Sequence, residues 1–487
     1  MKRTLLYIIG AAALLSVTGC DKDFLTRDPK LSQSTEITLS NYEGLRNATF
    51  GAYYYLASTG WYGNSWVLDA EMRSGNGKKS SYKDSGRCSQ SYTWNYTEDN
   101  TSAMWAYCYY TVAMANNVID NLEGKETAEV TTQDLNNLKA ECLFLRAFSH
   151  FENVLTYGQP YTYAVKNDKE SLGVPYVYHT DPAGKPARET VISNYENVVK
   201  DLLEAESIID PAYVHAGTAD PAATVNINTI RALLSRVYLY MGEWQKSADY
   251  ATLVINSGKY RLWTADEYPT VWTAEAGTGE VIFEIYGKIS NESNGSWDDI
   301  SWVTNPAGYG DPQVAPSLLA MYEDGDVRLK AYRTDEKGES GCWWTAKYAG
   351  KGDNASPDCN NVVILRLSEM YLNRAEALKN GASVPGVTAV KDLNEIAGIR
   401  GASAYTSAGQ NDIETERRKE LAWEGHYIYD LARWGKAVTR AESEYTLCTM
   451  NLNVAFPGYQ WALPIPKREL DINENLVPNP GYSTSTK

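Results

Sequence analysis

Residues 226–260 carry the pattern that most restricts how this chain can fold. Apolar side chains recur there at helical spacing on both sides of Gly242, which predicts two helices joined by a tight turn. The apolar faces would be built from Ala232, Leu233, Val237 and Leu239 before the turn and from Trp244, Ala248, Ala251 and Ile255 after it. A chain organised around such a hairpin is predicted to be mainly α-helical.

The same type of pattern recurs elsewhere in the chain. A second, more irregular hairpin is predicted over 364–396, with a break at Gly381. Further helices are predicted over 41–56, 105–122, 134–157 and 194–209. Ser40 is the expected cap of the first of these. Small and aromatic residues in the paired helices resemble tetratricopeptide hairpins, and we expect about four such irregular units.

Two long stretches, 60–100 and 265–360, have a different composition. They are rich in Gly, Ser, Asn, Asp, Trp and Tyr, and they lack helical periodicity. Long loops in a compact domain are usually functional, and binding groups collect on loops that a rigid scaffold supports. We therefore expect the helices to form the frame and these loops to form the working surface.

The aromatic composition favours a surface that binds a ligand and stays wet. The chain has 36 Tyr and 14 Trp but only 7 Phe. Tyr and Trp combine an apolar ring with a polar group, which suits the C–H faces and hydroxyl edges of sugars. The alternative is that these rings fill seams between helices, and we expect many of them to do so.

The first 19 residues have the proportions of a secretory signal peptide. Lys2 and Arg3 precede an uncharged, largely apolar run over 5–15, shorter than the roughly 20 residues that span a bilayer. The sequence VTGC, which ends at Cys20, resembles the lipobox of bacterial lipoproteins. We predict lipidation of Cys20 and stable anchoring through several acyl chains, with an ordinary secretory signal as the alternative.

Charge and side-chain spacing argue against several classes of partner. The formal net charge of −16 opposes binding to the phosphate backbone of nucleic acids, so no nucleic acid partner is expected. The four His are scattered without metal-ligand spacing, and no loop has EF-hand-like spacing for Ca²⁺. We predict neither a metal nor a cofactor.

The cysteines allow one disulfide to be suggested. Six remain after Cys20, and export would permit disulfides among them in any of 15 pairings. Cys342 and Cys359 share one loop-rich stretch and are the best candidates for a pair. Cys142 lies in an apolar helix, where we predict a buried free thiol.

Several motifs follow one another along the chain and together resemble the SusD/RagB family. They lie at 140–158, 230–260, 317–328, 366–377, 416–435, 464–470 and 479–482. The helix around Arg366-Leu367-Ser368-Glu369 is the most recognisable of them. The resemblance covers essentially all of the chain after Cys20. One departure is 398–401, where the family often has a denser Arg cluster.

This resemblance implies a fold and a function. The implied fold is SusD-like, with four tetratricopeptide-like units, a region over 20–220 and a region over 221–487 that pack as one globular unit. Such proteins are lipid-anchored at the outer membrane, bind oligosaccharides, and form the lid of a SusC-like TonB-dependent transporter without catalysing a reaction. Asp21 and Asp23 resemble the surface-export signal of such lipoproteins, which would place the protein on the cell exterior.

The resemblance also suggests where the ligand binds. Aromatic side chains after the first loop region form an arc over the sugar in the family's starch-binding member, and the matching stretch here is 92–100. Trp94 and Tyr96 alternate, so both rings would face one side of an extended segment. Three groups are predicted to bind ligand: Trp94, Tyr96 and Asn100 with Asp69 and Arg73; Trp297, Trp302 and Tyr309; and Trp343 with Trp344.

Two other functions remain open. A peptide-binding member of the same family is one. A glycoside hydrolase is the other, and it needs two carboxylates roughly 5–9 Å apart, for which Asp298 and Asp299 are the nearest pair. The chain lacks GxSxG, HExxH and phosphate-loop motifs, so we predict that it is not an enzyme.

The charged residues of the C-terminal motifs should not be mistaken for a site. We predict that they form a polar network that holds the C-terminal half on the helical repeats. Its members would be Glu369, Arg374, Glu376, Glu420, Glu424 and Arg433.

Overall fold

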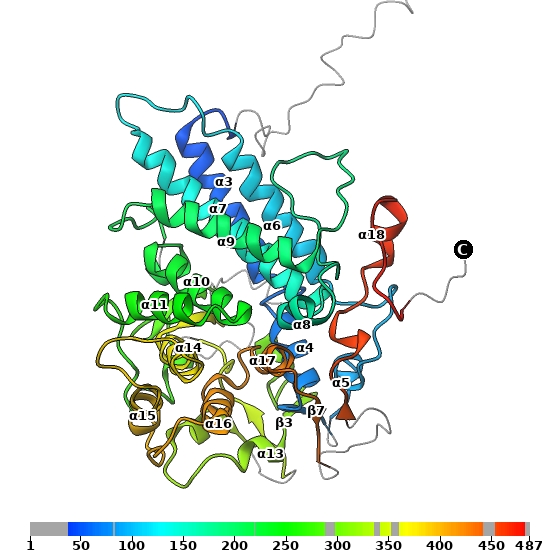
Figure 1. Ribbon diagram of the computed structural model, residues 1–487, viewed down its shortest axis with the longest axis vertical. Helices are drawn as coiled ribbons and strands as arrows, with labels where there is room; N and C mark the ends of the chain where they lie inside the picture. The colour runs from blue at the N-terminus through cyan, green and yellow to red at the C-terminus, as the bar shows by residue number, and fades with distance from the viewer. Residues whose placement is uncertain are drawn as a thin grey trace, which may run out of the picture.

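The computed structural model describes residues 38–80, 83–218, 220–287, 298–335, 341–351, 360–441 and 453–482. The predictions for Cys20 and Trp297, and the suggested pairing with Cys359, fall outside the described residues. Helices predominate in the described part, which confirms the mainly α fold class (Figure 1).

Eight of the described helices pack as four successive pairs. The pairs are α3 (Tyr42–Tyr54) with α6 (Met104–Ile119), α7 (Thr132–Tyr157) with α9 (Val191–Ile208), α10 (Ile227–Met241) with α11 (Trp244–Ile255), and α14 (Leu367–Lys379) with α15 (Ala389–Ile399). Contacts of α6 with α7, α9 with α10 and α11 with α14 join the pairs into one stack. Figure 1 shows the first two pairs at the top and the others below them. The four expected hairpin units are therefore present.

Local signals in the sequence explain where these helices begin and end. Thr131 and Asp134 form a reciprocal capping box at the start of α7. The α10–α11 turn is made by Gly242, whose φ of 74° suits glycine. The expected cap Ser40 is wrong by one residue, because Asn41 is the extended residue whose side chain accepts a hydrogen bond from the Gly44 amide, at 2.9 Å.

The core lies along α7, which is buried over most of its length. Phe148 stacks against Trp61 and Tyr62 with ring centroids 5.9 Å away in both cases. Some Trp and Tyr rings therefore do fill the seams around helices, as the alternative interpretation of the composition predicts. Cys142 is a buried free thiol, as predicted, and burial raises its pKa.

The loop stretches contain short elements that the sequence did not predict. The short helices are α4 (Ser65–Ser74), α5 (Ser89–Thr93), α12 (Ile300–Val303) and α13 (Pro316–Leu319). Antiparallel two-stranded ladders join β1 (Gly77–Lys79) to β3 (Pro312–Val314), β2 (Val281–Ile285) to β6 (Val362–Arg366), and β4 (Tyr332–Arg333) to β5 (Trp344–Thr345). The hairpin predicted over 364–396 is wrong at its start, because residues up to Arg366 lie in β6.

The C-terminal part completes the described fold. It contains α16 (Gln410–Leu421), α17 (Tyr427–Trp434), α18 (Lys467–Ile472) and the ladder of β7 (Val438–Thr439) with β8 (Asn453–Val454). The earlier helix α8 (Tyr161–Asn167) packs against α17. Figure 1 shows α17 beside α4 near the centre of the molecule and α18 farther up on the right. The large apolar core includes residues from Leu39 to Leu476, so both halves of the chain contribute to it. The boundary at residue 220 stays a prediction.

Buried ion pairs hold the C-terminal helices together, which confirms the predicted polar network. Arg366 binds the carboxylates of Glu420 at 2.6 Å and Glu424 at 2.7 Å. The remaining predicted members form the pairs Arg236–Glu369 at 2.7 Å, Arg374–Asp392 at 2.8 Å and Arg433–Glu376 at 2.5 Å. These side chains are used by the fold and are closed to a ligand.

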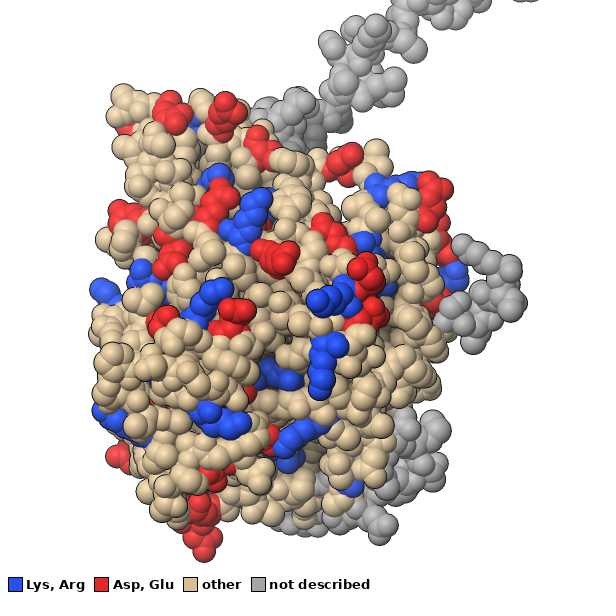
Figure 2. All heavy atoms as spheres, viewed as in Figure 1, with Lys and Arg blue, Asp and Glu red and all other residues tan. Residues whose placement is uncertain are grey.

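The surface is mixed in charge. On the face shown in Figure 2, acidic and basic side chains intermingle, and most of the surface is neither. Among the described residues, none of the helices combines the length and the apolar character that crossing a bilayer requires.

Candidate ligand-binding surface

Two short helices position the polar residues predicted in the first loop. Asp69 and Arg73 lie on α4, and α5 packs against it. The Ser91 hydroxyl of α5 donates a hydrogen bond to the Asp69 carboxylate. Burial raises the pKa of the Asp69 carboxyl, although the hydrogen bond from Ser91 and the charge of Arg73 oppose the rise. The guanidinium of Arg73 is buried beneath the loop.

Trp94 is enclosed by the protein. Its ring is 2% exposed, its indole N–H donates to the Arg73 carbonyl oxygen at 3.2 Å, and the Arg73 guanidinium lies 4.5 Å from the ring. Trp461 packs edge-on at 5.3 Å. In this structure the ring fixes the loop to the scaffold and has no face open to a sugar.

The expected extended segment with two rings on one side is wrong. α5 occupies the residues before Trp94, which ends that helix with a left-handed φ of 55°. Tyr96 is also buried, with the Arg73 guanidinium 6.0 Å from its ring. Asn100 is exposed, and its side-chain amide has no hydrogen-bond partner among the described residues, so it is open to a ligand.

The structure brings the second predicted region against the first. Tyr309 packs on the small apolar cluster that includes residues of α4 and α5. The Arg87 guanidinium lies 3.6 Å from the centre of the Tyr309 ring, and Arg87 forms an ion pair with Asp298 at 2.9 Å. Trp302 lies edge-on to Tyr309, with ring centroids 6.5 Å apart.

These four partly exposed residues form a continuous surface, which we call the loop face: Arg87, Asp298, Trp302 and Tyr309. It offers aromatic rings beside a cation and a carboxylate. Such a set can stack on the apolar face of a sugar and hydrogen-bond to its hydroxyl groups. Sequence reasoning missed Arg87, because nothing nearby in the sequence indicates its partner 211 positions away.

The third predicted region divides between scaffold and surface. Trp344 is buried, and its indole N–H donates to the Gly310 carbonyl oxygen at 3.0 Å. Trp343 is 39% exposed. Trp344 therefore supports the loop that carries Tyr309, while Trp343 is available on the surface.

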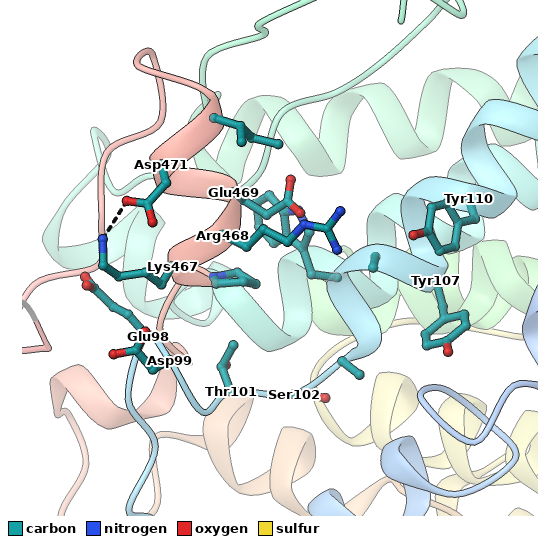
Figure 3. A pocket seen from close by; sticks show the side chains of 15 residues that line it. Glu98, Asp99, Thr101, Ser102, Tyr107, Tyr110, Lys467, Arg468, Glu469 and Asp471 are labelled. Carbon is teal, nitrogen blue, oxygen red and sulfur yellow. Dashed lines mark hydrogen bonds and ion pairs between the residues drawn. The ribbon is translucent and has the colours of Figure 1, made fainter.

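Sequence reasoning also missed a cleft of about 580 Å³ between α18 and the start of α6. Figure 3 shows Arg468 and Glu469 reaching from α18 toward Tyr107 and Tyr110 on α6, with Thr101 at the floor. The relevant signal was the run of tyrosines in the helices at 53–55 and 107–110. Helical periodicity alone does not say which of those rings face outward.

The described residues do not suggest a metal centre. None of the clusters of His, Cys, Asp and Glu within the described ranges has three members placed to hold a metal ion.

Two family models match this chain, one toward each end. Residues 23–239 match a SusD-like family described as "Starch-binding associating with outer membrane", and residues 322–482 match the SusD family. A SusD-like protein of Formosa agariphila, P2, is 27% identical over 96% of this chain and 98% of that protein.

Solved structures agree with these matches. A SusD superfamily protein from Bacteroides thetaiotaomicron is 30% identical, with a TM-score of 0.80 over 90% of this chain and 100% of that chain. Surface glycan-binding protein A from the same organism, in complex with laminarihexaose, shares the fold at 21% identity, with a TM-score of 0.71 over 90% and 99% of the two chains. From these matches and the stacked helix pairs, the chain belongs to the SusD family.

Proposed function

We propose that this protein is a cell-surface lipoprotein that captures oligosaccharides and passes them to a TonB-dependent outer-membrane transporter. The matched family is described as starch-binding and associated with the outer membrane, and a protein of the same fold binds laminarihexaose. Cys20 would carry the lipid, and Asp21 and Asp23 would direct the protein to the cell exterior. Recovery of a SusC-like transporter with the detergent-solubilised protein would test the partner.

The loop face is the observation that carries glycan capture. Buried contacts hold the loops around it in place: the Trp94 indole binds a carbonyl of α4, and the Trp344 indole binds the loop that carries Tyr309. A site held in place before the ligand arrives loses less entropy on binding. Asn100 and Trp343 are further exposed groups that would extend such a surface.

The carboxylate pair considered for hydrolysis is engaged in other roles. Asp298 pairs with Arg87, and Asp299 caps α12 by accepting hydrogen bonds from the Ser301 amide and hydroxyl, at 2.9 and 2.8 Å. Each carboxylate is therefore bound to a partner within the protein, whereas a hydrolase needs two carboxyl groups placed on either side of the glycosidic bond. This supports binding without catalysis.

The test is calorimetry of the full chain, purified in detergent, with laminarihexaose, maltohexaose, cellohexaose and xylohexaose. We expect at least one of these neutral hexasaccharides to bind. The double variant Arg87→Ala/Tyr309→Ala should weaken that binding by about tenfold or more, because it removes a stacking ring and a charged donor together.

The matched control is Arg261→Ala. Arg261 is also an exposed arginine paired with a carboxylate, that of Glu267 at 2.6 Å, and it lies outside the loop face. Its affinity should equal that of the unmodified protein. Unchanged affinity in the double variant would reject the loop face, and binding of peptides without binding of any sugar would reject glycan capture.

A further inference from the structure

The cleft between α18 and α6 has an aromatic wall that continues onto the surface. Tyr107 and Tyr110 line the cleft, and their ring centroids are 5.9 Å apart. Tyr55 lies 5.2 Å from Tyr110, and Tyr54, which is 75% exposed, lies 5.5 Å from Tyr55. These four rings form an unbroken path, which we call the tyrosine ledge. Steps of this length are comparable to one sugar residue in a chain.

The backbone shape holds the inner end of this ledge in place. A Cβ atom at Gly60 would lie only 2.1 Å from a carbon of the Tyr107 ring. The absence of a side chain at residue 60 therefore lets the ring lie against the connection that precedes α4. Tyr107 is positioned by close contact, while 46% of the neighbouring Tyr110 is exposed.

The opposite wall of the cleft is polar. Arg468 is exposed and points into the cleft, and its guanidinium donors have no hydrogen-bond partner among the described residues. The Glu469 carboxylate accepts a hydrogen bond from Trp105, and half-burial raises its pKa, against the nearby charge of Arg468. This wall offers several donors and an acceptor to a ligand.

The floor of the cleft is fixed by hydrogen bonds between distant segments. The Lys467 amide donates to the Glu98 carbonyl oxygen at 2.8 Å, and the Thr101 hydroxyl donates to the Pro464 carbonyl oxygen at 3.0 Å. The Tyr157 hydroxyl donates to the Ser102 carbonyl oxygen at 2.7 Å. The two walls are therefore held at a set separation, and the cleft exists without a ligand.

The chemistry of the cleft selects among ligand classes. Four carboxylates and two cations line it, so an anionic glycan would meet net repulsion. None of its lining residues belongs to a β-strand, so the cleft has no sheet edge to which an extended peptide could be added. A ring wall facing donors and acceptors suits the C–H faces and hydroxyl groups of a neutral sugar.

We propose that this cleft and the tyrosine ledge form a second carbohydrate-binding site, which takes a neutral oligosaccharide independently of the loop face. The two surfaces share no residue. The segment that leads from α5 to the floor of the cleft carries the buried Trp94 and Tyr96. The two sites are therefore close in sequence but are lined by different residues. Two sites on one chain would hold a long glycan at two points and raise its effective affinity.

Native mass spectrometry can count the ligands on the full chain, with whichever neutral hexasaccharide of the panel binds. The unmodified protein should carry two, and the cleft variant Tyr110→Ala/Arg468→Gln should carry one. The loop-face variant Arg87→Ala/Tyr309→Ala should also carry one, and the combination should carry none. Each cleft substitution alone should weaken the second site by about fivefold or more. Gly60→Ala should weaken it too, because it displaces the Tyr107 ring without deleting it.

Two matched controls separate the cleft from general surface effects. Tyr459 is 47% exposed and contacts another tyrosine ring at 5.0 Å, as Tyr110 does, but it lies outside the cleft. Arg261, like Arg468, is an exposed arginine, but it is paired with Glu267 at 2.6 Å and lies outside the cleft. Tyr459→Ala and Arg261→Gln should each leave two ligands bound.

The outcomes distinguish this inference from the proposed function. Suppose that the unmodified protein binds a single ligand, which the loop-face variant loses and the cleft variant keeps. That result would overturn the second site and leave glycan capture standing. If the unmodified protein binds a single ligand and only the cleft variant loses it, the result would support the cleft and reject the loop face. If no hexasaccharide of the panel binds, both proposals are overturned.

Discussion

The buried ion-pair network of the C-terminal half and the loop face contain the same kinds of side chains, but the network holds the fold and the loop face is open to a ligand. Both contain an arginine bound to carboxylates and close to aromatic rings. The side chain of Arg366 is 1% exposed and its three nearest carboxylates are buried, whereas Arg87 and Asp298 are 31% and 58% exposed. The difference teaches that accessibility, rather than residue type, separates groups that hold this fold from groups that can meet a ligand.

The largest expected effect comes from breaking the network. Burial alone would raise the pKa of the Glu420 carboxyl, but the guanidinium groups of Arg400, Arg366 and Arg328 hold it well below its usual value. Arg366→Ala would leave Glu424 and Glu420 buried with fewer cations. We expect it to lower the free energy of unfolding by about 3–5 kcal/mol, measured by urea denaturation.

The control for this variant is Arg366→Lys, which keeps a positive charge but cannot form the same fork of hydrogen bonds. It should recover part of the loss. An Arg366→Ala protein with a stability close to that of the unmodified chain would show that the network contributes little, and it would remove the contrast with the loop face.

A buried carboxyl without an ion pair should behave in the opposite way. Glu152 accepts a hydrogen bond from Tyr62 at 3.1 Å and forms no ion pair within the described residues. Burial raises its pKa to about 8, although Arg236 opposes the rise. The folded protein therefore holds a proton that the unfolded chain releases above its ordinary pKa near 4.5, so stability falls as the pH rises between these values.

Glu152→Gln removes this titration. Relative to the unmodified protein, the variant should gain about 2–3 kcal/mol between pH 5 and pH 7, since each pKa unit is worth about 1.4 kcal/mol. Denaturation curves of both proteins at several pH values measure the difference. A difference that is constant over this range would mean that Glu152 is ionised in the folded protein.

Helical periodicity that extends over many residues explains what could be predicted from the sequence. The helix pairs, the buried Cys142 thiol and the network residues of α14 and α16 lie in segments long enough to show helical periodicity. In such segments the pattern itself tells which side faces the core. Some of the family motifs, such as those at 140–158 and 366–377, fall in the same segments, so motif and periodicity together predict the fold there.

The binding surfaces could not be predicted in the same way. α5 is five residues long, too short to show a period, so Trp94 and Tyr96 were assigned to an extended segment. Trp94 is covered by Trp461, which is far away in the sequence. Likewise, the exposure of Tyr110, 46%, depends on how distant segments pack around α6, which only the tertiary structure shows.

The smallest expected effect completes the contrast with Arg366. Arg87→Ala deletes an exposed ion pair with Asp298 and a contact with the Tyr309 ring, and water replaces both partners at little cost. Exposed pairs typically contribute between 0 and about 1 kcal/mol, so urea denaturation should show a loss of about 1 kcal/mol or less. Replacing Arg366 with alanine would then lower the free energy of unfolding several times more than replacing Arg87 with alanine. If Arg87→Ala destabilised the fold as strongly as Arg366→Ala, the loop face would be part of the structural frame, and any weaker glycan binding by its variants would be a consequence of unfolding.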